Sequence, residues 1–286
     1  MYLCTMTKKP QLDFYEMCTG VTAFSSTRHG GCSRGSYATF NINRYCGDSE
    51  ENISKNRKAL CQMLGIGDDC LLMPHQVHET KVAKIDEEFF SMSTAERQEV
   101  LEGVDALMTN LRGICIGVST ADCIPVLLYD GEQQAICAIH AGWRGTVKRI
   151  VEKAIEAMVT AYGTEPRHVK AQIGPGIHLD SFEVGDEVYE TFLQEGFDMN
   201  AISKQFLSTP PSTLHHPPST SKWHIDLPEC NRQQLMASGV LPEHIRVSPV
   251  CTFEQTADYF SARRLGINSG RIFTGIMFQP SYKYTI

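Results

Sequence analysis

A thiol and an imidazole stand at matching ends of one stretch of the chain. Cys123 precedes an apolar run at residues 124–129. His140 ends a second apolar run, which follows the dipeptide Asp130-Gly131. Asp-Gly is a favoured hairpin dipeptide, and strands joined by such a turn run antiparallel. The start of the first strand then lies beside the end of the second, so the sequence predicts that Cys123 and His140 are neighbours.

A third side chain, His78 in the segment QVH, makes a metal site a reasonable hypothesis. Imidazole and thiolate together suit zinc, and three protein ligands that leave a fourth position for water are the pattern of a catalytic zinc site. Bound zinc lowers the pKa of water to about 7, which supplies hydroxide at neutral pH. His78, Cys123 and His140 match no compact zinc-finger spacing, so the prediction depends on residue types.

Two other interpretations of these residues stay open. In the first, Cys123 and His140 form a metal-free pair in which the imidazole is the base and the thiolate attacks a carbonyl. His78 separates the two hypotheses, because a hydrolase pair does not need it and a three-ligand site does. In the second, a blue-copper oxidase would need an axial Met or its equivalent and further histidine clusters. The sequence has no His-x-His pair, which disfavours copper relative to zinc.

The loop AGWRG, directly after His140, is a candidate anion site. Residues 145–163 carry an apolar stripe at helical spacing and end in a glycine, which predicts a helix. Backbone N–H groups and the helix dipole at its start favour an anion such as phosphate, and Arg144 adds donors. Asp122 is a candidate proton carrier because it adjoins Cys123, and orienting a metal ligand is the alternative.

Other polar side chains offer weaker cases. Arg28 lies in a Gly/Ser-rich loop, where composition favours a solvated surface arginine over a ligand contact. Arg263 and Arg264 follow an aromatic stretch and either bridge buried carboxylates or bind substrate. The role of His75 is left open, and His178 is expected to be exposed.

The elements that must position these residues follow from hydrophobic periodicity and turn signals. Residues 71–85 favour a strand that begins at or contains the two histidines of this segment, and residues 104–119 favour a hairpin-like pair of strands. The other predicted elements are helices from about 50 to 64, 94–101 and 228–238, a strand before the Gly174-Pro175-Gly176 turn, and strands at 245–250 and 272–278.

Composition narrows the functional class. The chain has 286 residues and a net charge of -7 without a Lys/Arg-rich run, which argues against a nucleic-acid or anionic-membrane partner. No apolar run approaches the roughly 20 residues of a membrane helix, and the first residues show no secretory signal. Eleven cysteines without a CxxC pair favour reduced thiols and a cytoplasmic location. No heptad pattern is present, so a monomer is the default expectation.

A series of short segments resembles the YfiH-type family, first labelled laccase-like polyphenol oxidases and now associated with purine nucleoside phosphorolysis and adenosine deamination. The resemblance runs from about residue 21 to the C-terminus, and ADC followed by HAGWRGT is its most specific part. The matching segments are TRHGG (27–31), NINRYCGD (41–48), QVH (76–78), TADCIPVLLYD (120–130), HAGWRGT (140–146), IGPGI (173–177), FEVGDEV (182–188) and CTF…YFSARR (251–264).

The resemblance implies an α+β fold, a single-domain four-layer α/β/β/α sandwich with mixed sheets, similar to bacterial toxin cysteine hydrolases. The domain would span residues 1–286, with 1–20 as an N-terminal extension and the proline-rich loop 208–221 as an insertion. It also implies a zinc site formed by His78, Cys123 and His140, the residues also expected to be catalytic.

The resemblance further implies the reactions. Adenosine, inosine, guanosine and methylthioadenosine would be cleaved by phosphate, and zinc-activated water would attack C6 of adenosine to give inosine. Phosphate held by Arg144, Arg28 and backbone N–H groups would attack C1′ of the ribose, and Arg264 is a further candidate contact for substrate or phosphate. One relative is linked to editing of cell-wall precursors, so amide hydrolysis is an alternative, and non-enzymatic nucleoside binding is a third.

Overall fold

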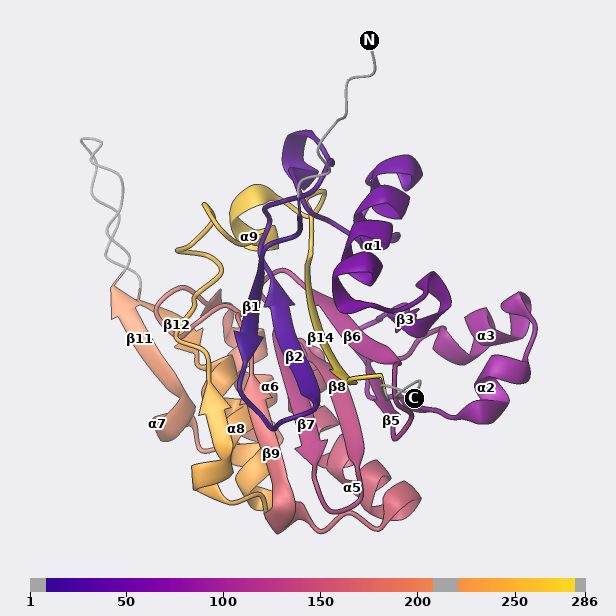
Figure 1. The fold of residues 1–286 in the computed structure, drawn as a ribbon. Coiled ribbons are helices and arrows are strands. Elements are labelled where there is room, and N and C mark those ends of the chain that lie inside the picture. The colour runs from indigo at the N-terminus through magenta and orange to yellow at the C-terminus, as the bar shows by residue number, and fades with distance from the viewer. Residues whose placement is uncertain (1–8, 208–220, 281–286) are drawn as a thin grey trace.

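The computed structural model describes residues 9–207 and 221–280, which form a mixed α+β fold built on three sheets (Figure 1). The largest sheet has six strands in the order β13-β9-β7-β8-β5-β4, and the second has five in the order β1-β2-β14-β6-β3. Both sheets are mixed, because β4 with β5, β9 with β13 and β3 with β6 are parallel pairs among antiparallel ones. The third is a small antiparallel sheet in the order β10-β12-β11. The predicted α+β class with mixed sheets is confirmed.

The strands are β1 (Leu12–Tyr15), β2 (Val21–Ser26), β3 (Leu71–Leu72), β4 (Val82–Ile85), β5 (Ala106–Thr109), β6 (Cys115–Thr120), β7 (Ile124–Asp130), β8 (Ala135–Ala141), β9 (Val169–Ile173), β10 (Glu183–Val184), β11 (Ser203–Leu207), β12 (Ser221–Ile225), β13 (Ile245–Val247) and β14 (Ile272–Phe278). The α-helices are α1 (Glu50–Leu64), α2 (Glu87–Ser91), α3 (Thr94–Leu101), α4 (Trp143–Val147), α5 (Ile150–Tyr162), α6 (Asp186–Gln194), α7 (Met199–Ile202), α8 (Leu227–Ala237) and α9 (Ala262–Leu265).

The hairpin β7–β8 lies between the five-stranded sheet and a layer of helices. Every residue of both strands is buried. Val126 and Leu128 belong to the core that includes apolar residues of α5 and α8, whereas Leu127 and Tyr129 belong to the core shared with β6 and β14. Successive side chains of a strand point to opposite faces, so a strand covered on both sides is apolar throughout. This packing explains the continuous apolar runs in the sequence.

The predicted hairpin is confirmed, and its turn differs from the expected one. β7 and β8 pair antiparallel over their full length, and residues 131–134 connect them. The Asp130 carboxylate accepts hydrogen bonds from the backbone N–H groups of Glu132 and Gln133, at 3.0 and 3.2 Å. An Asp side chain that accepts a hydrogen bond from the backbone N–H two residues further on marks the first residue of a turn, and the turn continues beyond the residue after it. Asp-Gly therefore opens a four-residue loop and is not itself a two-residue turn.

The predicted hairpin at residues 104–119 is wrong. β5 pairs with β4 and β8 in the six-stranded sheet, whereas β6 pairs with β3 and β14 in the five-stranded sheet. Both strands are buried at every position. An apolar run shows that a strand is covered but does not show which strand it pairs with, and here the chain crosses from one sheet to the other.

The single helix predicted at residues 145–163 is two helices, α4 and α5. Arg149 separates them with φ 62°, in the left-handed region. Its guanidinium lies 3.8 Å from the centre of the Phe197 ring and donates to the carbonyl oxygen of Glu195 at 2.9 Å. These contacts come from a distant segment, which is why the apolar stripe of the local sequence gave no sign of the break.

Residues 71–85 form two short strands, β3 and β4, with His75 and His78 in the connection between them. The prediction that the histidines lie in or at the start of a strand is therefore wrong, and His75 forms only an isolated bridge with Glu102. Helices α1, α3 and α8 and strands β9 and β14 lie where the sequence predicts them, and β13 ends at Val247, before the predicted residue 250.

Residues 12–15 of the predicted N-terminal extension form β1, and residues 208–220 of the predicted insertion lie outside the described residues. No helix of the described part is long and apolar enough to cross a membrane.

Candidate functional site

Three candidate ligands meet at the open end of the β7–β8 hairpin. Cys123 directly precedes β7 and His140 is the last but one residue of β8, so strand pairing places them side by side. His78 approaches from the β3–β4 connection, with its Nε2 atom 3.8 Å from the Cys123 sulfur. One possible ligand atom from each residue lies within 4.8 Å of the other two. The predicted neighbourhood of Cys123 and His140 is confirmed, and His78 joins it.

The three side chains differ in exposure. His140 is buried, Cys123 is partly exposed and His78 is exposed. The cluster is therefore open to solvent on the side of His78. A catalytic metal site keeps a coordination position open, whereas a structural site is closed by four protein ligands. The burial pattern matches the open type.

Asp105, a residue that the sequence analysis missed, lies behind both histidines. Its Oδ1 atom accepts a hydrogen bond from the His140 ring at Nδ1, at 2.7 Å, and both side chains are buried. Its carboxylate also accepts the backbone N–H groups of Val77, His78 and Glu79, at 3.3, 3.0 and 2.8 Å. The usable signal was an acidic residue inside the apolar run VDALM, since a fully buried carboxylate needs partners.

The segment of His78 has two further constraints. Gln76 donates from its amide to the carbonyl oxygen of Ser119 at 2.9 Å and accepts the backbone N–H of Ser119 at 2.7 Å. His78 itself has φ 63°, a left-handed conformation that non-glycine residues adopt only when the surroundings impose it. The loop is thus tied to β6 on one side and to Asp105 on the other.

Asp122 holds the segment that carries Cys123. Its two carboxylate oxygens accept hydrogen bonds from the Thr252 hydroxyl and the Arg263 backbone N–H, each at 2.8 Å, and its carbonyl oxygen accepts the Ile177 N–H at 2.8 Å. Its φ is 91°. Of the two roles that the sequence left open, these contacts favour orienting Cys123 over carrying a proton, because both oxygens are already engaged.

Gly142 leaves no room for a side chain beside the cluster. A Cβ atom at this position would lie 2.7 Å from Cδ2 of His78 and 3.2 Å from the sulfur of Cys123. The first distance is too short for any Cβ contact, and the second is tighter than an ordinary van der Waals contact. The glycine of the AGW segment is therefore required for the close approach of β8 to the other two side chains.

In the protein without metal, the shifted pKa values of Cys123 and His140 favour a thiolate beside an imidazolium. Burial raises the pKa of Cys123, but the adjacent His140 and His78 more than offset this and lower it to about 6. Burial lowers the pKa of His140, whereas Cys123 and Asp105 raise it to about 9. Burial also raises the pKa of Asp105, and the hydrogen bond and charge of His140 reverse this, so its pKa is lowered. Near neutral pH the thiol proton therefore resides on His140.

The predicted arginines occupy different settings. Arg144 is exposed, with its guanidinium 4.3 Å from the centre of the Trp143 ring. Arg264 is exposed over the Phe253 ring at 4.7 Å. Arg28 donates to the carbonyl oxygens of Ala38 and Thr256 at 2.9 and 2.7 Å, so much of its guanidinium holds backbone in place.

Three other residues acquire a structural context. The Arg263 side chain donates to the carbonyl oxygen of Glu183. His75 bonds Glu102 at 2.6 Å and stacks on the Tyr45 ring, with 4.1 Å between ring centres. His178, expected to be exposed, is half-buried instead.

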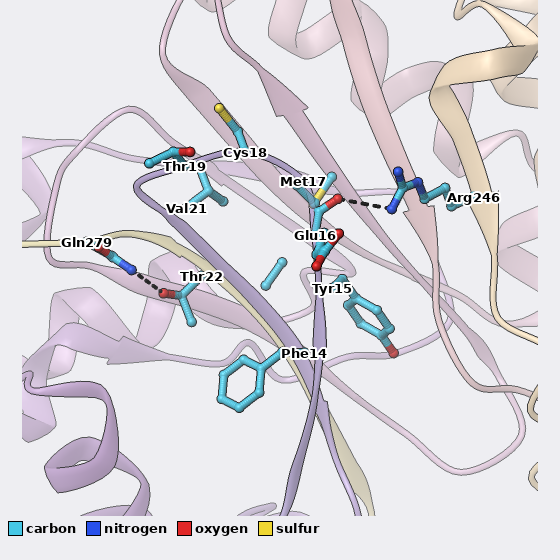
Figure 2. A pocket seen from close by; sticks show the side chains of 11 residues that line it. Phe14, Tyr15, Glu16, Met17, Cys18, Thr19, Val21, Thr22, Arg246 and Gln279 are labelled. Atoms are coloured by element: carbon cyan, nitrogen blue, oxygen red, sulfur yellow. Dashed lines mark hydrogen bonds between the residues drawn. The ribbon is translucent and has the colours of Figure 1, made fainter.

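A cavity of about 580 Å³ lies away from this cluster (Figure 2). It is lined by residues of β1 and β2 and the turn between them, together with Arg246 and Gln279. Arg246 donates to the carbonyl oxygen of Glu16, and Gln279 to the Thr22 hydroxyl. None of the predicted site residues lines this cavity.

The residues present fit a bound transition metal. Two imidazoles and one thiol are a donor set suited to zinc, and a thiol with a lowered pKa is available as the thiolate that binds metal. Because Nδ1 of His140 bonds Asp105, the other ring nitrogen is left to face the cluster. A histidine ligand that bonds a carboxylate through its second nitrogen is the usual arrangement at protein metal sites.

The sequence matches a described family over most of its length. Residues 22–279 match the model of a family described as "Multi-copper polyphenol oxidoreductase laccase". The chain is 44% identical over 278 residues to a protein of Bacteroides thetaiotaomicron named purine nucleoside phosphorylase, covering 96% of this chain and 99% of that one. It is also 44% identical over 271 residues to adenosine deaminase RL5 from an unknown prokaryotic organism, covering 95% and 99%.

Solved structures share the fold. The hypothetical protein YfiH of Bacillus licheniformis superposes with a TM-score of 0.82 at 26% identity, covering 94% of this chain and 97% of that one. YlmD of Geobacillus stearothermophilus gives a TM-score of 0.79 at 27% identity, covering 96% and 99%.

Proposed function

The chain belongs to the YfiH-type family, whose model is described as multi-copper polyphenol oxidoreductase laccase, and we propose that it is a zinc-dependent purine nucleoside phosphorylase that also deaminates adenosine. Relatives named for these two activities cover almost the whole chain. The observation that carries the proposal is the cluster of His78, Cys123 and His140, with its possible ligand atoms within 4.8 Å of one another. The substrates proposed are adenosine, inosine, guanosine and methylthioadenosine.

In this proposal His78, Cys123 and His140 bind the metal, and neighbouring residues set the protonation and orientation of these side chains. Cys123 contributes a thiolate, His78 its Nε2 atom, and His140 the ring nitrogen that Asp105 leaves free. Zinc bound there would act as a Lewis acid and lower the pKa of a water molecule. The open side at His78 admits the substrate, while the buried His140 and the close approach of Gly142 exclude solvent from behind.

Phosphorolysis also requires a phosphate site, and Arg144 is our first candidate. It is exposed and lies two residues beyond Gly142, which borders the cluster. A guanidinium stacked on an indole keeps its N–H groups at the edge of the stack, where they can form a fork with phosphate oxygens. Arg264 is the second candidate, because its neighbour Arg263 is bonded to Asp122. Arg28 we assign mainly to holding the loop around it.

One assay separates the reactions. Purified protein is incubated with adenosine, with and without inorganic phosphate, and the products are identified by chromatography. Phosphorolysis gives adenine and ribose-1-phosphate only when phosphate is present, whereas deamination gives inosine in both samples. Absence of both products from protein with bound metal would overturn the proposal.

The identity of the metal is tested on the same preparation. Elemental analysis should find about one zinc per chain, and removal of the metal by a chelator should abolish turnover. Zinc added back should restore it. Recovery with copper alone, accompanied by oxidation of a phenolic substrate, would favour the laccase activity in the description of the family.

A second candidate function rests on a separate observation. Cys123, His140 and Asp105 form the nucleophile, base and orienting carboxylate of a thiol hydrolase, and the pKa of Cys123 is lowered to about 6. This arrangement favours hydrolysis of an amide, such as the bond between a sugar lactyl group and a wrongly incorporated amino acid. Amide cleavage that survives complete removal of metal would support it over the phosphorylase.

We further propose that the protein acts as a cytoplasmic monomer on small molecules, without a nucleic-acid or membrane partner. The cysteines of the described ranges are free thiols, which supports a reducing compartment. We also propose the four-layer α/β/β/α arrangement, supported by the packing of α1 on the five-stranded sheet and of α5 and α8 on the six-stranded sheet. Light scattering tests the monomer, and an experimental structure tests the layers.

A further inference from the structure

We propose that Asp105 is the positioning residue of this site: one carboxylate sets the ring orientation of His140 and the backbone of His78, so that both imidazoles are ready to bind metal. The inference rests on the proposed metal centre and goes beyond it, because Asp105 is not itself a ligand in the cluster. The position of Asp105 follows from the strand pairing of the six-stranded sheet. Asp105 directly precedes β5, which pairs with β8, and its carbonyl oxygen accepts the backbone N–H of His140 at 2.8 Å.

The first half of the role concerns the ring of His140. A carboxylate can only accept, so the 2.7 Å bond requires the proton on Nδ1. The lone pair of a neutral His140 is then on Nε2. Rotation of the ring would break this bond and leave a buried carboxylate charge without its strongest partner. The contact therefore fixes both the tautomer and the direction of the ring.

The second half concerns the loop of His78. The backbone N–H groups of Val77, His78 and Glu79 all point at the Asp105 carboxylate. Three successive N–H groups converge on one anion only if the backbone curls around it, and the left-handed φ of His78 provides that curl. The side chain of His78 is thereby directed at the Cys123 sulfur.

The contact with the His140 ring and the contacts with the His78 loop use the same two carboxylate oxygens of Asp105. An isosteric substitution of Asp105 therefore tests both. Oδ1 accepts from the His140 ring and the His78 N–H, and Oδ2 accepts from the N–H groups of Val77 and Glu79. In Asp105→Asn one oxygen becomes an NH2 group. If the NH2 replaces Oδ2, it faces two N–H donors and the loop loses its anchor. If it replaces Oδ1, it faces the His78 N–H, and it can bond His140 only after the ring proton has moved to Nε2, which removes the ligand lone pair.

Asp130 offers a matched control. It is as fully buried as Asp105, lies at the other end of the same hairpin, and also accepts backbone N–H groups. Asp130→Asn therefore changes a buried carboxylate to an amide without touching the cluster. A general effect of this change on folding would be common to both variants, whereas a positioning effect would be confined to Asp105→Asn.

The test measures the affinity for Zn²⁺ by competition with a chromophoric chelator, in wild type and both variants, after circular dichroism has shown that they fold. We expect Asp105→Asn to bind Zn²⁺ about 10- to 100-fold more weakly, as for other carboxylates that support a histidine ligand. Asp130→Asn should bind as wild type does. Equal affinity of all three proteins, or equal losses in both variants, would overturn the inference.

A spectroscopic readout on the wild type keeps the inference testable if Asp105→Asn does not fold. In the Zn²⁺-loaded protein, nuclear magnetic resonance should find the Nδ1 proton of His140 present, shifted downfield and slow to exchange. Metal on Nδ1, or a rapidly exchanging proton there, would overturn the inference. Neither measurement uses a nucleoside, so a protein with this Zn²⁺ behaviour and no nucleoside turnover would overturn the proposed function alone.

Discussion

The β7–β8 hairpin has a closed end, which is held by contacts between near neighbours in sequence. Its other end is open, and residues there are held by contacts between distant parts of the chain. At the closed end, Asp130 accepts hydrogen bonds from residues two and three positions further on. At the open end, Asp105 and His140 are 35 positions apart, and Asp122 and Thr252 are 130 apart. The same two strands thus end in a local turn and in a site assembled from distant segments.

The two ends also differ in how their buried carboxylates are satisfied. The oxygens of Asp105 accept four hydrogen bonds, whereas Oδ2 of Asp130 has no partner among the described residues. Left-handed non-glycine residues occur at both ends, with Gln134 in the turn and His78 and Asp122 at the site. At the site, hydrogen bonds to Asp105 hold His78 and a hydrogen bond from Thr252 holds Asp122. Strained backbone persists where the surroundings over-determine it, and such places are typically functional. The contacts at the open end thus fix the orientation of the site residues, whereas those at the turn end connect the two strands.

The largest effect should come from removing a ligand at the open end. Cys123→Ala should lose zinc and lower nucleoside turnover roughly a thousandfold, equivalent to several kcal/mol of metal assistance. Cys137→Ala, in the middle of β8, should keep its zinc and lose only about 1 kcal/mol of stability from the small cavity. Metal analysis and steady-state kinetics measure both. Unchanged zinc content and turnover in Cys123→Ala would remove the functional distinction between the two ends.

A smaller effect should follow from crowding the open end. Gly142→Ala places a methyl group 2.7 Å from the His78 ring, which must move, so zinc affinity should fall about tenfold or more. The control is Gly67→Ala, because a Cβ there meets nothing within 4 Å. Chelator competition measures the affinities. If the two variants bind zinc equally well, the close packing of the cluster is not required for binding.

The thiol of the metal-free protein should show its own pH dependence. Because the pKa of Cys123 is lowered to about 6, its alkylation by iodoacetamide should reach half of the maximal rate near pH 6. Burial raises the pKa of Cys32, so this exposed thiol should react only at higher pH. His140→Asn removes the neighbouring cation and should shift the Cys123 midpoint upward. Mass spectrometry of the labelled peptides follows each site, and coincident midpoints for Cys123 and Cys32 would contradict the ion pair.

The free energy of unfolding of the metal-free protein should change little between pH 6.5 and 8.5. The lowered pKa of Cys123 gives stability that is lost as pH falls through about 6. The raised pKa of His140 gives stability that is lost as pH rises through about 9. Between these values the two slopes have opposite signs and nearly cancel. Urea unfolding of the metal-free protein at pH 6.5 and 8.5 measures this, and a difference of more than about 1 kcal/mol between them would show that only one group is shifted.

The smallest effect should come from the turn end. Asp130→Asn keeps a carbonyl oxygen for Glu132 and Gln133, loses the charge on those bonds and puts an NH2 group in place of the unpartnered Oδ2, which together cost about 1–3 kcal/mol of stability. Turnover should equal that of the wild type. Urea unfolding and kinetics test this, and a loss of turnover would show that the turn end also contributes to the site.

Much of the fold was readable because its signals are local. The apolar runs of β7 and β8, the stop of α5 at Gly163 and the start of α1 after Ser49 all depend on residues a few positions apart. The pairing of β5 and β6 was not readable, because an apolar strand carries no mark of its partner. The break at Arg149 was missed for the same reason, since Phe197 and Glu195 lie in the segment after α6, far from Arg149 in the sequence.

The sequence by itself determined the residue types of the candidate ligands and, through the hairpin, the pairing of Cys123 with His140. The pairing was predictable because antiparallel strands joined by a short loop fix which residues face each other. Only the tertiary structure decided that His78 reaches them, that Asp105 supports both imidazoles and that Asp122 is occupied in holding Cys123. Each of these depends on side chains from separate strands and loops, and a buried carboxylate shows its partners only when the chain has folded around it.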